Sequence, residues 1–434
     1  MASCTVSSIS SVCSSASITG CYSTNDQGPP VSAHTFTTAT SEGEDVQAST
    51  GDPSFVPSPA PSTLSFDVDA TPLHERSADR LSSTASSCEI PTASQAKESV
   101  CVTIRFRPLS LREVHQEDDV AWHADGDMVV RNEYSPLTAY AFDKVFGPTT
   151  TTRGVYNVAA RNVVRGAMEG INGTVFAYGV TSSGKTYTMH GDPKSPGIIP
   201  LAVKDVFSII QETPNREYLL RVSYLEIYNE VINDLLNPAG QNLRIREDTE
   251  GTYVEGITEE VVLSPFHALS LITAGEELRH VGSNNYNLLS SRSHTVFTLI
   301  IESSPRVMDP YEDVEEVIVS QLNLIDLAGS ESSKTETTGQ RRKEGSYINK
   351  SLLTLGTVIG KLSEGKASHV PYRDSKLTRL LQPSLCGYGR VSLICTLTPA
   401  SSNMEETHNT LKFAHRAKRL TVQAIANRVS NMFS

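Results

Sequence analysis

One short stretch of this 434-residue chain constrains the fold more than any other: residues 178–189 read Y-G-V-T-S-S-G-K-T-Y-T-M. Gly179 and the run Gly184-Lys185-Thr186 satisfy the phosphate-loop pattern G-x-x-x-x-G-K-[ST]. Two glycines let the backbone curl so that its N–H groups point at phosphates, and the following helix offers its positive N-terminal end. Lys185 is then placed to reach the β- and γ-phosphates, and the Thr186 hydroxyl to ligate Mg²⁺. The motif therefore predicts a strand, a loop and a helix that together bind a nucleoside triphosphate.

The residues around the loop fit this prediction. Asn172-Gly173 opens an apolar run, residues 174–178, that is typical of a buried strand, so the loop falls where a strand gives way to a helix. A chance match is the alternative, because the pattern also occurs in long chains that bind no nucleotide. The loop residues expected to surround the phosphates are Gly179, Val180, Thr181, Ser182, Ser183, Gly184, Lys185 and Thr186.

Composition narrows the class of protein. No apolar stretch approaches the roughly 18 residues of a membrane-spanning helix, which predicts a soluble protein. The seven cysteines include no C-x-x-C pair, so we expect a reducing compartment and neither a complete disulfide framework nor a cysteine metal site. The net charge of −12 argues against general nucleic-acid binding.

Residues 1–96 differ in kind from the rest of the chain. They contain 34 Ser and Thr, ten acidic residues and only two basic residues, Arg76 and Arg80. Such a segment buries too little apolar surface to offset its chain entropy, so it is predicted to be a disordered acidic tail. A targeting peptide is the alternative, because the start is Met-Ala-Ser and rich in hydroxyls. Organelle import signals carry basic residues, however, and none precedes Arg76.

The ordered chain is predicted to begin near Lys97, and its strands alternate with helices. Pro193 and Pro196 are expected to end the helix after the phosphate loop early. An acidic turn at 309–316 is expected to join two of the strands. The predicted strands are 100–106, 139–146, 219–228, 243–246, 261–263, 295–302, 317–326 and 391–398; the predicted helices are 153–169, one beginning at 201, 265–279, 346–362, 376–382 and 405–419. This alternation around a phosphate loop indicates one α/β domain with helices on both faces of the sheet.

Two later segments carry the chemistry that a phosphate loop needs. Asp326-Leu327-Ala328-Gly329 follows an apolar strand, where a carboxylate can hold Mg²⁺ through water and a glycine N–H can contact a γ-phosphate. A plain turn is the alternative for D-x-x-G by itself. In residues 287–294, N-L-L-S-S-R-S-H, two adjacent hydroxyls and a guanidinium are suited to a metal-bound triphosphate, although the segment alone is also consistent with a polar loop.

Together the three segments resemble the kinesin motor domain, in this order and at these separations. The resemblance extends from about residue 100 to residue 427 and includes R-F-R-P-L at 105–109, I-N-K-S-L at 348–352 and H-V-P-Y-R-D-S-K-L-T-R-L-L at 369–381. The run R-R-K-E-G-S-Y-I-N-K-S-L-L-T-L-G-T-V-I and the I-R-E-D segment at 245–248 are most similar to the centromere-associated (kinesin-7 type) branch, especially its plant members. The resemblance implies the kinesin motor fold, with a central mixed β-sheet, over 97–419, followed by a neck linker and C-terminal end at 420–434.

The resemblance also implies roles for particular residues. The adenine pocket would comprise Arg105, Pro108, Tyr156 and Tyr187, whose rings and guanidinium plane suit a flat base; a surface position for Arg105 is the alternative. The metal shell would be Thr186, Ser291 and, through water, Asp326, with Gly329 N–H sensing the γ-phosphate.

Hydrolysis by this family needs a positioned water and a proton acceptor. Glu344, expected in the loop after D-L-A-G-S-E, matches the glutamate that would pair with Arg292 and close the site. A surface salt bridge is the alternative.

One departure from the family pattern lies in the phosphate loop, where Val180 stands in place of the usual Gln. The position is not among the groups that the chemistry requires, so we expect a modest change in nucleotide affinity and intact hydrolysis.

A basic region indicates an acidic partner. Residues 334–390 contain 11 Lys and Arg against four acidic residues, a charge of +7 within a chain of −12. Interleaved aromatics, a recognition-helix signature and zinc spacing are absent from the sequence, which argues against DNA. The resemblance implies tubulin instead, with contacts from Lys350, His369, Tyr372, Arg373 and Arg379.

Residues 420–427, L-T-V-Q-A-I-A-N, correspond to the neck linker that docks when ATP is bound. Leu420, Val422 and Ile425 are expected to pack on the core, and Asn427 matches the residue that latches the docked strand. A linker C-terminal to the motor implies plus-end-directed movement on cytoplasmic microtubules. No heptad repeat follows, so a homodimer is expected only through a coiled coil outside these residues.

The sequence therefore predicts a microtubule-stimulated ATPase that uses ATP and Mg²⁺. A GTPase-type switch is one alternative, but guanine specificity normally needs N-K-x-D, and the only N-K, at 349–350, is followed by Ser351-Leu352. A microtubule-binding adaptor that binds nucleotide without cycling is the other.

Overall fold

A mixed ten-stranded sheet organises the computed structural model, which describes residues 97–248, 251–281, 291–306, 315–331, 339–365 and 369–431. The predicted tail at 1–96 lies outside these residues, as do positions 287–290 of the third motif and most of the acidic turn at 309–316. The strands of the sheet are β2 (Cys101–Phe106), β6 (Lys144–Phe146), β7 (Gly173–Tyr178), β8 (Arg216–Tyr228), β9 (Val231–Asp234), β12 (Glu260–Val261), β13 (Ser293–Pro305), β14 (Glu315–Asp326), β15 (Arg390–Leu397) and β17 (Arg428–Asn431).

The order of the strands places the phosphate loop at a shared edge. The sheet runs β12-β8-β13-β14-β7-β15-β2-β6, with β9 paired to β8 and β17 to β14. The five strands β14, β7, β15, β2 and β6 are parallel, whereas β13 is antiparallel to both β14 and β8. Because the carboxyl ends of neighbouring parallel strands meet at one edge, ligands of open α/β sheets bind there. The predicted mixed sheet is confirmed. The strands predicted at 295–302 and 317–326 are present as parts of β13 and β14, which pair antiparallel, although the sequence did not predict their pairing.

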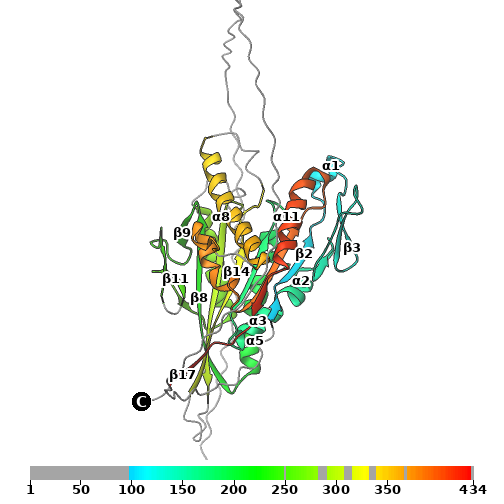
Figure 1. The fold of residues 1–434 in the computed structure, drawn as a ribbon. Helices are drawn as coiled ribbons and strands as arrows, with labels where there is room; N and C mark the ends of the chain where they lie inside the picture. The colour runs from blue at the N-terminus through cyan, green and yellow to red at the C-terminus, as the bar shows by residue number, and fades with distance from the viewer. Residues whose placement is uncertain are drawn as a thin grey trace, which may run out of the picture. The chain divides into compact units, whose positions relative to one another are not determined.

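Helices cover both faces of the sheet, as predicted, and β7 shows why. Its residues alternate in direction: Phe176 and Tyr178 belong to one buried apolar cluster, and Val175 and Ala177 to another on the opposite face. The first cluster packs against α8 (Gly339–Glu364), α9 (Lys376–Leu380), α10 (Gln382–Leu385) and α11 (Met404–Ala417) (Figure 1). The second packs against α2 (Thr152–Ala159), α3 (Arg161–Met168), α4 (Lys185–Met189), α5 (Ile198–Glu212) and α6 (Pro265–Val281). No helix within the described ranges is both long and apolar enough to cross a membrane.

Three small sheets complete the strands, and the sequence foresaw them only in part. They are β3 (Trp122–Asp125), β4 (Val129–Asn132) and β5 (Ala139–Ala141); β10 (Arg244–Glu247) and β11 (Thr252–Glu255); and β1 (Lys97–Ser99) with β16 (Thr421–Gln423). The single strand predicted at 139–146 is wrong. The chain leaves the small sheet after β5 and joins the main sheet at β6, with Asp143 between them accepting a hydrogen bond from Val102 N–H.

Some predicted helix bounds are also wrong. The helix predicted at 153–169 is two helices, α2 and α3, which meet at Ala160. The helix predicted at 346–362 begins earlier, at Gly339, so Glu344 lies in α8 and not in a loop. The helix predicted at 376–382 divides into α9 and α10 around Leu381. The break at Ala160 carries no proline or glycine, so periodicity alone does not reveal it, whereas Pro383 at the start of α10 was a local signal for the other break.

The segment after α11 runs along the core as the linker prediction requires. Strand β16 pairs antiparallel with β1, and β17 pairs with the first part of β14. Leu420 and Val422 are buried, and Ile425 is half-buried. Asn427 fixes the segment through its backbone: its N–H donates to Gly170 O at 2.9 Å, and its carbonyl accepts from Val319 N–H at 3.3 Å.

Candidate nucleotide-binding site

The phosphate loop connects the end of β7 to α4 in a conformation that depends on its glycines. Gly184, with φ of 101°, is the residue that precedes α4, and Gly179 has φ of 155°. A Cβ on Gly179 would lie 2.3 Å from the carbonyl oxygen of Thr396 on the neighbouring strand β15. Only glycine fits at that position, because neither the backbone angle nor the space admits a side chain.

The loop lysine is folded back on the loop. Lys185 Nζ donates to the carbonyl oxygens of Gly179 and Val180, both at 2.9 Å, and its side chain is buried. Burial lowers the pKa of Lys185 from its ordinary value, and the nearby carboxylates of Asp326 and Glu331 oppose that shift. The cation is therefore held against the loop backbone, near two acidic groups at and just after the end of β14.

Val180 takes part through its backbone. Its carbonyl accepts from Lys185 and from Ser183 Oγ at 2.7 Å, whereas its side chain is buried. This geometry explains why Val is compatible with the loop, because the bonds at this position do not use the side chain.

Two of the three predicted metal ligands meet in the structure. Thr186 Oγ1 donates to Asp326 Oδ2 at 2.6 Å, and the other carboxylate oxygen, Oδ1, is buried without a hydrogen-bond partner among the described residues. Hydroxyl and carboxylate oxygens are the ligands that Mg²⁺ prefers, and a buried carboxylate oxygen with an open lone pair is suited to a metal-bound water. These residues therefore fit Mg²⁺.

Besides the bond of Thr186 to Asp326, three hydrogen bonds join the phosphate loop to the D-L-A-G-S-E segment. Ser330 N–H donates to Gly179 O at 3.1 Å. The carboxylate of Glu331 accepts from Thr181 N–H at 2.8 Å and from the Thr181 hydroxyl. A Cβ on Gly329 would lie 2.3 Å from Glu331 Oε2, so glycine at 329 leaves room for this contact. The motifs did not single out Glu331, although it is the acid of the D-L-A-G-S-E run.

The third motif reaches the same point from β13. Gly329 N–H donates to Ser291 O at 2.8 Å, which joins the start of β13 to the end of β14. The structure thus brings Gly329 and Ser291 together with the loop that carries Thr186. The predicted pair of Arg292 and Glu344 stays untested, because the Glu344 side chain lies outside what the structure describes.

His294, the last residue of this motif, connects the site to α8. Its Nδ1 accepts from Ala328 N–H at 2.9 Å, and its Nε2 lies 2.8 Å from Ser351 Oγ. Because Ala328 N–H is a donor, Nδ1 is unprotonated and Nε2–H donates to Ser351. Burial, with the nearby cations of Arg279 and Lys185, lowers the pKa of His294 to about 3, so the ring is neutral at physiological pH. The sequence placed this residue in the motif but gave it no role.

Besides Lys185, a second buried cation lies at this site and contacts the start of β13. Arg279 of α6 donates to Ser293 Oγ at 3.1 Å and to Glu276 at 3.4 Å, and its side chain is fully buried. Tyr224 of β8 donates to the same Glu276 carboxylate. This network ties α6 and β8 to β13, the strand that carries His294 and follows Ser291.

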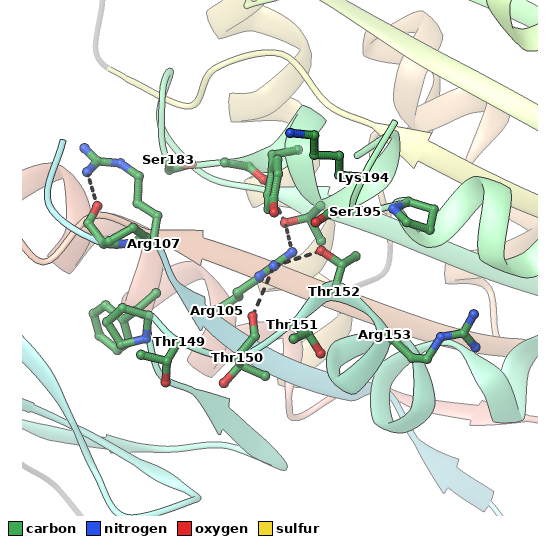
Figure 2. Close-up of a pocket in the computed structure, with 17 residues that line it drawn as sticks. Arg105, Arg107, Thr149, Thr150, Thr151, Thr152, Arg153, Ser183, Lys194 and Ser195 are labelled. Atoms are coloured by element: carbon green, nitrogen blue, oxygen red, sulfur yellow. Dashed lines mark hydrogen bonds between the residues drawn. The ribbon is translucent and has the colours of Figure 1, made fainter. Parts of the chain in front are cut away.

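Beside the loop lies a cavity of about 720 Å³, large enough for a base and ribose. Three of the four predicted adenine-pocket residues line it: Arg105, Pro108 and Tyr187. Figure 2 shows threonines 149–152 along one wall, with Lys194 and Ser195 from the segment after α4 on another. The cavity opens next to Ser183 and Gly184, so a ligand there is continuous with the phosphate loop.

Arg105 is a wall of this cavity and not a surface residue. It is 7% exposed, and it donates to Thr188 Oγ1 and to Thr152 Oγ1, each at 3.0 Å (Figure 2). Its guanidinium carbon lies 5.3 Å from the centre of the Tyr187 ring, within the range of a cation–π contact. These bonds fix the guanidinium plane against the aromatic ring.

Tyr156 is not brought to the cavity. Its ring is buried in the apolar cluster beneath α2 and α5, and its hydroxyl donates to Asp205 Oδ2 at 2.7 Å. Burial and the Asp205 hydrogen bond raise the pKa of Tyr156 well above its ordinary value. The family resemblance placed Tyr156 correctly on the first helix, α2, but its ring does not line the cavity.

A salt bridge braces the loop from the end of β2. Arg107 donates to Ser182 O at 2.7 Å and to both carboxylate oxygens of Glu113. The short helix α1 (Leu111–His115) positions Glu113 with a capping box whose N-terminal residue is Ser110. The Arg107 hydrogen bonds lower the pKa of Glu113 to about 2. The S-x-x-E spacing at 110–113 was the sequence signal for this brace.

The residues predicted to bind tubulin lie on α8 and on the segment that ends at α9, away from the cavity walls. Lys350 is exposed on α8, and His369, Tyr372 and Arg373 lie on the segment that leads through the short 3₁₀ helix η2 (Tyr372–Asp374). Arg379 follows on α9 and is half-buried. These residues thus lie on α8, η2 and α9 and just before η2, and the three elements contact one another on the face of the sheet that holds the first apolar cluster.

The fold and the site together define a class: a phosphate-loop protein of mixed α/β architecture in which two downstream segments meet the loop. The chain belongs to the kinesin motor domain family, whose sequence model matches residues 105–420.

Plant proteins are among the similar relatives. The Kinesin-like protein KIN-7E, chloroplastic, of Oryza sativa subsp. japonica is 77% identical over 337 residues, which are 78% of this chain and 29% of that protein. The Kinesin-like protein KIN-7D, mitochondrial, of Arabidopsis thaliana is 76% identical over 338 residues, 78% of this chain and 32% of that protein. These names confirm the similarity to the kinesin-7 branch and its plant members. The chain spans about a third of the length of these relatives.

Solved structures agree. A fast kinesin, described with implications for its ATPase mechanism and microtubule interactions, is 39% identical, with a TM-score of 0.70 over 76% of this chain and 94% of that one. A KIF14 dimer with AMP-PNP in complex with a microtubule is 38% identical, with a TM-score of 0.71 over 76% of this chain and 97% of that one. Both confirm the kinesin motor fold.

Proposed function

We propose that the chain is a microtubule-stimulated ATPase that couples ATP hydrolysis to movement toward microtubule plus ends. The observation that carries this proposal is the meeting of three segments at one point. Thr186 of the phosphate loop contacts Asp326, Gly329 contacts Ser291, and Ala328 contacts His294, which reaches α8. A change at the phosphates is therefore transmitted to α8, whose Lys350 belongs, with His369, Arg373 and Arg379, to what we call the basic face.

Nucleotide binding uses the cavity and the loop. Arg105, Pro108 and Tyr187 bind the base, and residues 179–186 bind the phosphates with their N–H groups and with Lys185. Thr186, Ser291 and, through water, Asp326 would hold Mg²⁺, which would neutralise charge on the phosphate oxygens.

Hydrolysis requires the loop and the two downstream segments to close. Gly329 N–H and Ser291, which are bonded to each other at 2.8 Å, approach the terminal phosphate together. Arg292 pairs with a carboxylate to exclude bulk water and orient the attacking water. Glu344 is the predicted carboxylate, and Glu331 is a second candidate, because it already contacts the phosphate loop at Thr181.

The bond between Thr181 N–H and Glu331 has a consequence for this step. Phosphate-loop N–H groups bind phosphate oxygens, and in this structure a carboxylate takes one of them. Entry of a terminal phosphate therefore releases Glu331 and frees its carboxylate for Arg292.

We assign the movement along the filament to docking of the C-terminal segment, residues 420–434. We place the motor domain at 97–419, the neck linker and C-terminal end at 420–434, and a separate acidic tail at 1–96. Linker docking uses the β16 and β17 pairings and the backbone of Asn427. Docking C-terminal to the motor directs movement to the plus end. We place the protein on cytoplasmic microtubules.

ATP turnover with and without polymerised tubulin tests the proposal, with GTP assayed in parallel and Lys185→Ala as the inactive control. We expect ATP hydrolysis that filaments accelerate several-fold, and gliding of polarity-marked filaments that shows plus-end movement. Equal rates with and without filaments would reject the motor and favour a nucleotide-binding adaptor. Preference for GTP would favour the GTPase alternative.

A further inference from the structure

Glu247 holds two of the arginines that the motor would present to its filament. It is the last residue of β10, and its two carboxylate oxygens bind different partners: Oε2 accepts from Arg373 Nη2 at 2.5 Å, and Oε1 accepts from Arg379 Nε at 2.8 Å. The two arginines lie 126 and 132 residues further along the chain, on η2 and α9.

The backbone that carries these arginines is fixed by other contacts. Ser375 caps α9 by accepting from Thr378 N–H at 3.1 Å, and Lys376 N–H donates to Glu230 Oε2 at 2.8 Å. Leu377 and Leu381 of the same segment are buried in the apolar cluster. Folding of the segment therefore does not depend on Glu247, which acts on the arginine side chains themselves.

The contact changes what the arginines can offer to a partner. The Arg373 side chain is 75% exposed, whereas those of Arg379 and Glu247 are 27% and 28% exposed. Hydrogen bonds from Arg373 and Arg379 lower the pKa of Glu247, so the carboxylate stays ionised and cancels part of the positive charge. An acidic partner that uses the same N–H groups must first replace this carboxylate.

We propose that Glu247 is an intramolecular competitor for the acidic filament surface: it occupies Arg373 and Arg379 in the free motor, and filament carboxylates displace it on binding. This inference rests on the proposed function, because it takes the filament as the partner of these arginines. The carboxylate of Glu247 is exchanged for a carboxylate of the filament. Because the arginines are already partly neutralised in the free motor, only a strongly acidic surface displaces Glu247, and the filament is released readily when Glu247 returns.

The hairpin that carries Glu247 offers a matched control. Glu255 of β11 pairs with Arg246 of β10 at 3.0 Å, so it is a carboxylate of the same hairpin with one arginine partner that is not on the predicted filament face. Glu255→Gln changes the net charge as Glu247→Gln does, but it releases neither Arg373 nor Arg379. Glu247→Asp keeps the charge but shortens the side chain, which weakens the simultaneous contact with both arginines.

The test is the microtubule concentration that half-saturates ATP turnover, measured with the full chain at two salt concentrations. For Glu247→Gln we expect a value about two- to tenfold lower than that of the wild type, and a steeper dependence on salt, because the exposed Arg373 and the half-buried Arg379 both lose their carboxylate partner. For Glu255→Gln we expect a change of less than about twofold, since it is a single exposed pair away from the face. Glu247→Asp should fall between Glu247→Gln and the wild type.

The outcomes separate this inference from the proposed function. If filaments do not stimulate the wild type, the motor function itself is wrong. If they do, an unchanged or higher half-saturating concentration for Glu247→Gln overturns the competitor role. An equal gain in Glu255→Gln also overturns it, because the effect would then be one of net charge alone.

Discussion

The phosphate-loop end of the molecule and its basic face handle charge in opposite ways. At the phosphate loop, Lys185 and Asp326 are buried, and each is bonded to backbone or side-chain groups of the loop. On the basic face, Lys350 and Arg373 are exposed, and the pair that Arg373 forms with Glu247 lies at the surface.

This difference predicts how strongly each region responds to the substitution of a charged residue and to added salt. A buried charge interacts through a low-dielectric interior, so the loss of one group has a large effect that salt hardly alters. Exposed charges are screened by salt and contribute little one by one. The buried end therefore carries the chemistry with few residues, and the exposed face carries binding by the sum of many.

The largest effect is expected at the buried end. Arg292→Ala should lower ATP hydrolysis about 100-fold while ATP still binds, because the guanidinium acts when the site closes and not when nucleotide enters. Glu344→Ala and Glu331→Ala, compared side by side, show which carboxylate pairs with Arg292. Single-turnover hydrolysis and fluorescent-nucleotide binding measure the two steps separately, and normal turnover of Arg292→Ala would remove this residue from the mechanism.

A pH dependence of stability is expected from His294, the residue that joins the two regions. Burial holds its pKa at about 3 against an ordinary value of 6.5, so the unfolded chain binds the proton more readily between these values. The stability tied to His294 is complete above about pH 6.5 and is lost as the pH falls. Between pH 6.5 and pH 5 the loss should reach roughly 2 kcal/mol.

Denaturant unfolding of the wild type and of His294→Gln, each at pH 7 and at pH 5, measures this loss. The variant should be less stable at pH 7, because it loses the bonds to Ala328 and Ser351, but its stability should fall less toward pH 5. Parallel pH profiles for the two proteins would show that other groups cause the dependence.

A smaller effect is expected at the exposed face. Arg373→Ala should raise the half-saturating microtubule concentration only about two- to fivefold, because a single exposed cation is removed. The difference from the wild type should shrink as salt is added. Filament co-sedimentation at low and high salt checks this, and a large, salt-independent loss would mean that Arg373 belongs to a buried contact in the complex.

The smallest effect is expected at Val180, in the buried loop. Val180→Gln should change nucleotide affinity by no more than about twofold to threefold and leave hydrolysis intact, because this position bonds through its carbonyl oxygen. Steady-state ATP turnover measures it. A large gain in turnover would show that the side chain matters more than the backbone geometry indicates.

Much of the site could be predicted from the sequence, because each of its motifs is a run of consecutive residues. The spacing from Gly179 to Thr186 encodes the loop, and an acid at a strand end placed Asp326 beside it. Glu331 was missed because its partner, Thr181, lies 150 residues away in the chain. Tyr156 was assigned to the cavity by resemblance to the family, but its hydroxyl bonds Asp205 and its ring is buried in the core. A match of motifs does not report which neighbour a side chain meets. The predicted pairing of Arg292 with Glu344 stays a prediction.

The sequence by itself determined the phosphate loop, the class of sheet and the family. Each depends on short motifs whose residues are close together in the chain. Only the tertiary structure decided which other distant groups meet: Glu331 with Thr181, His294 with Ser351, and Glu247 with Arg373 and Arg379. The order of the strands brings these residues together, and that order depends on how both faces of the sheet are buried, not on any local pattern.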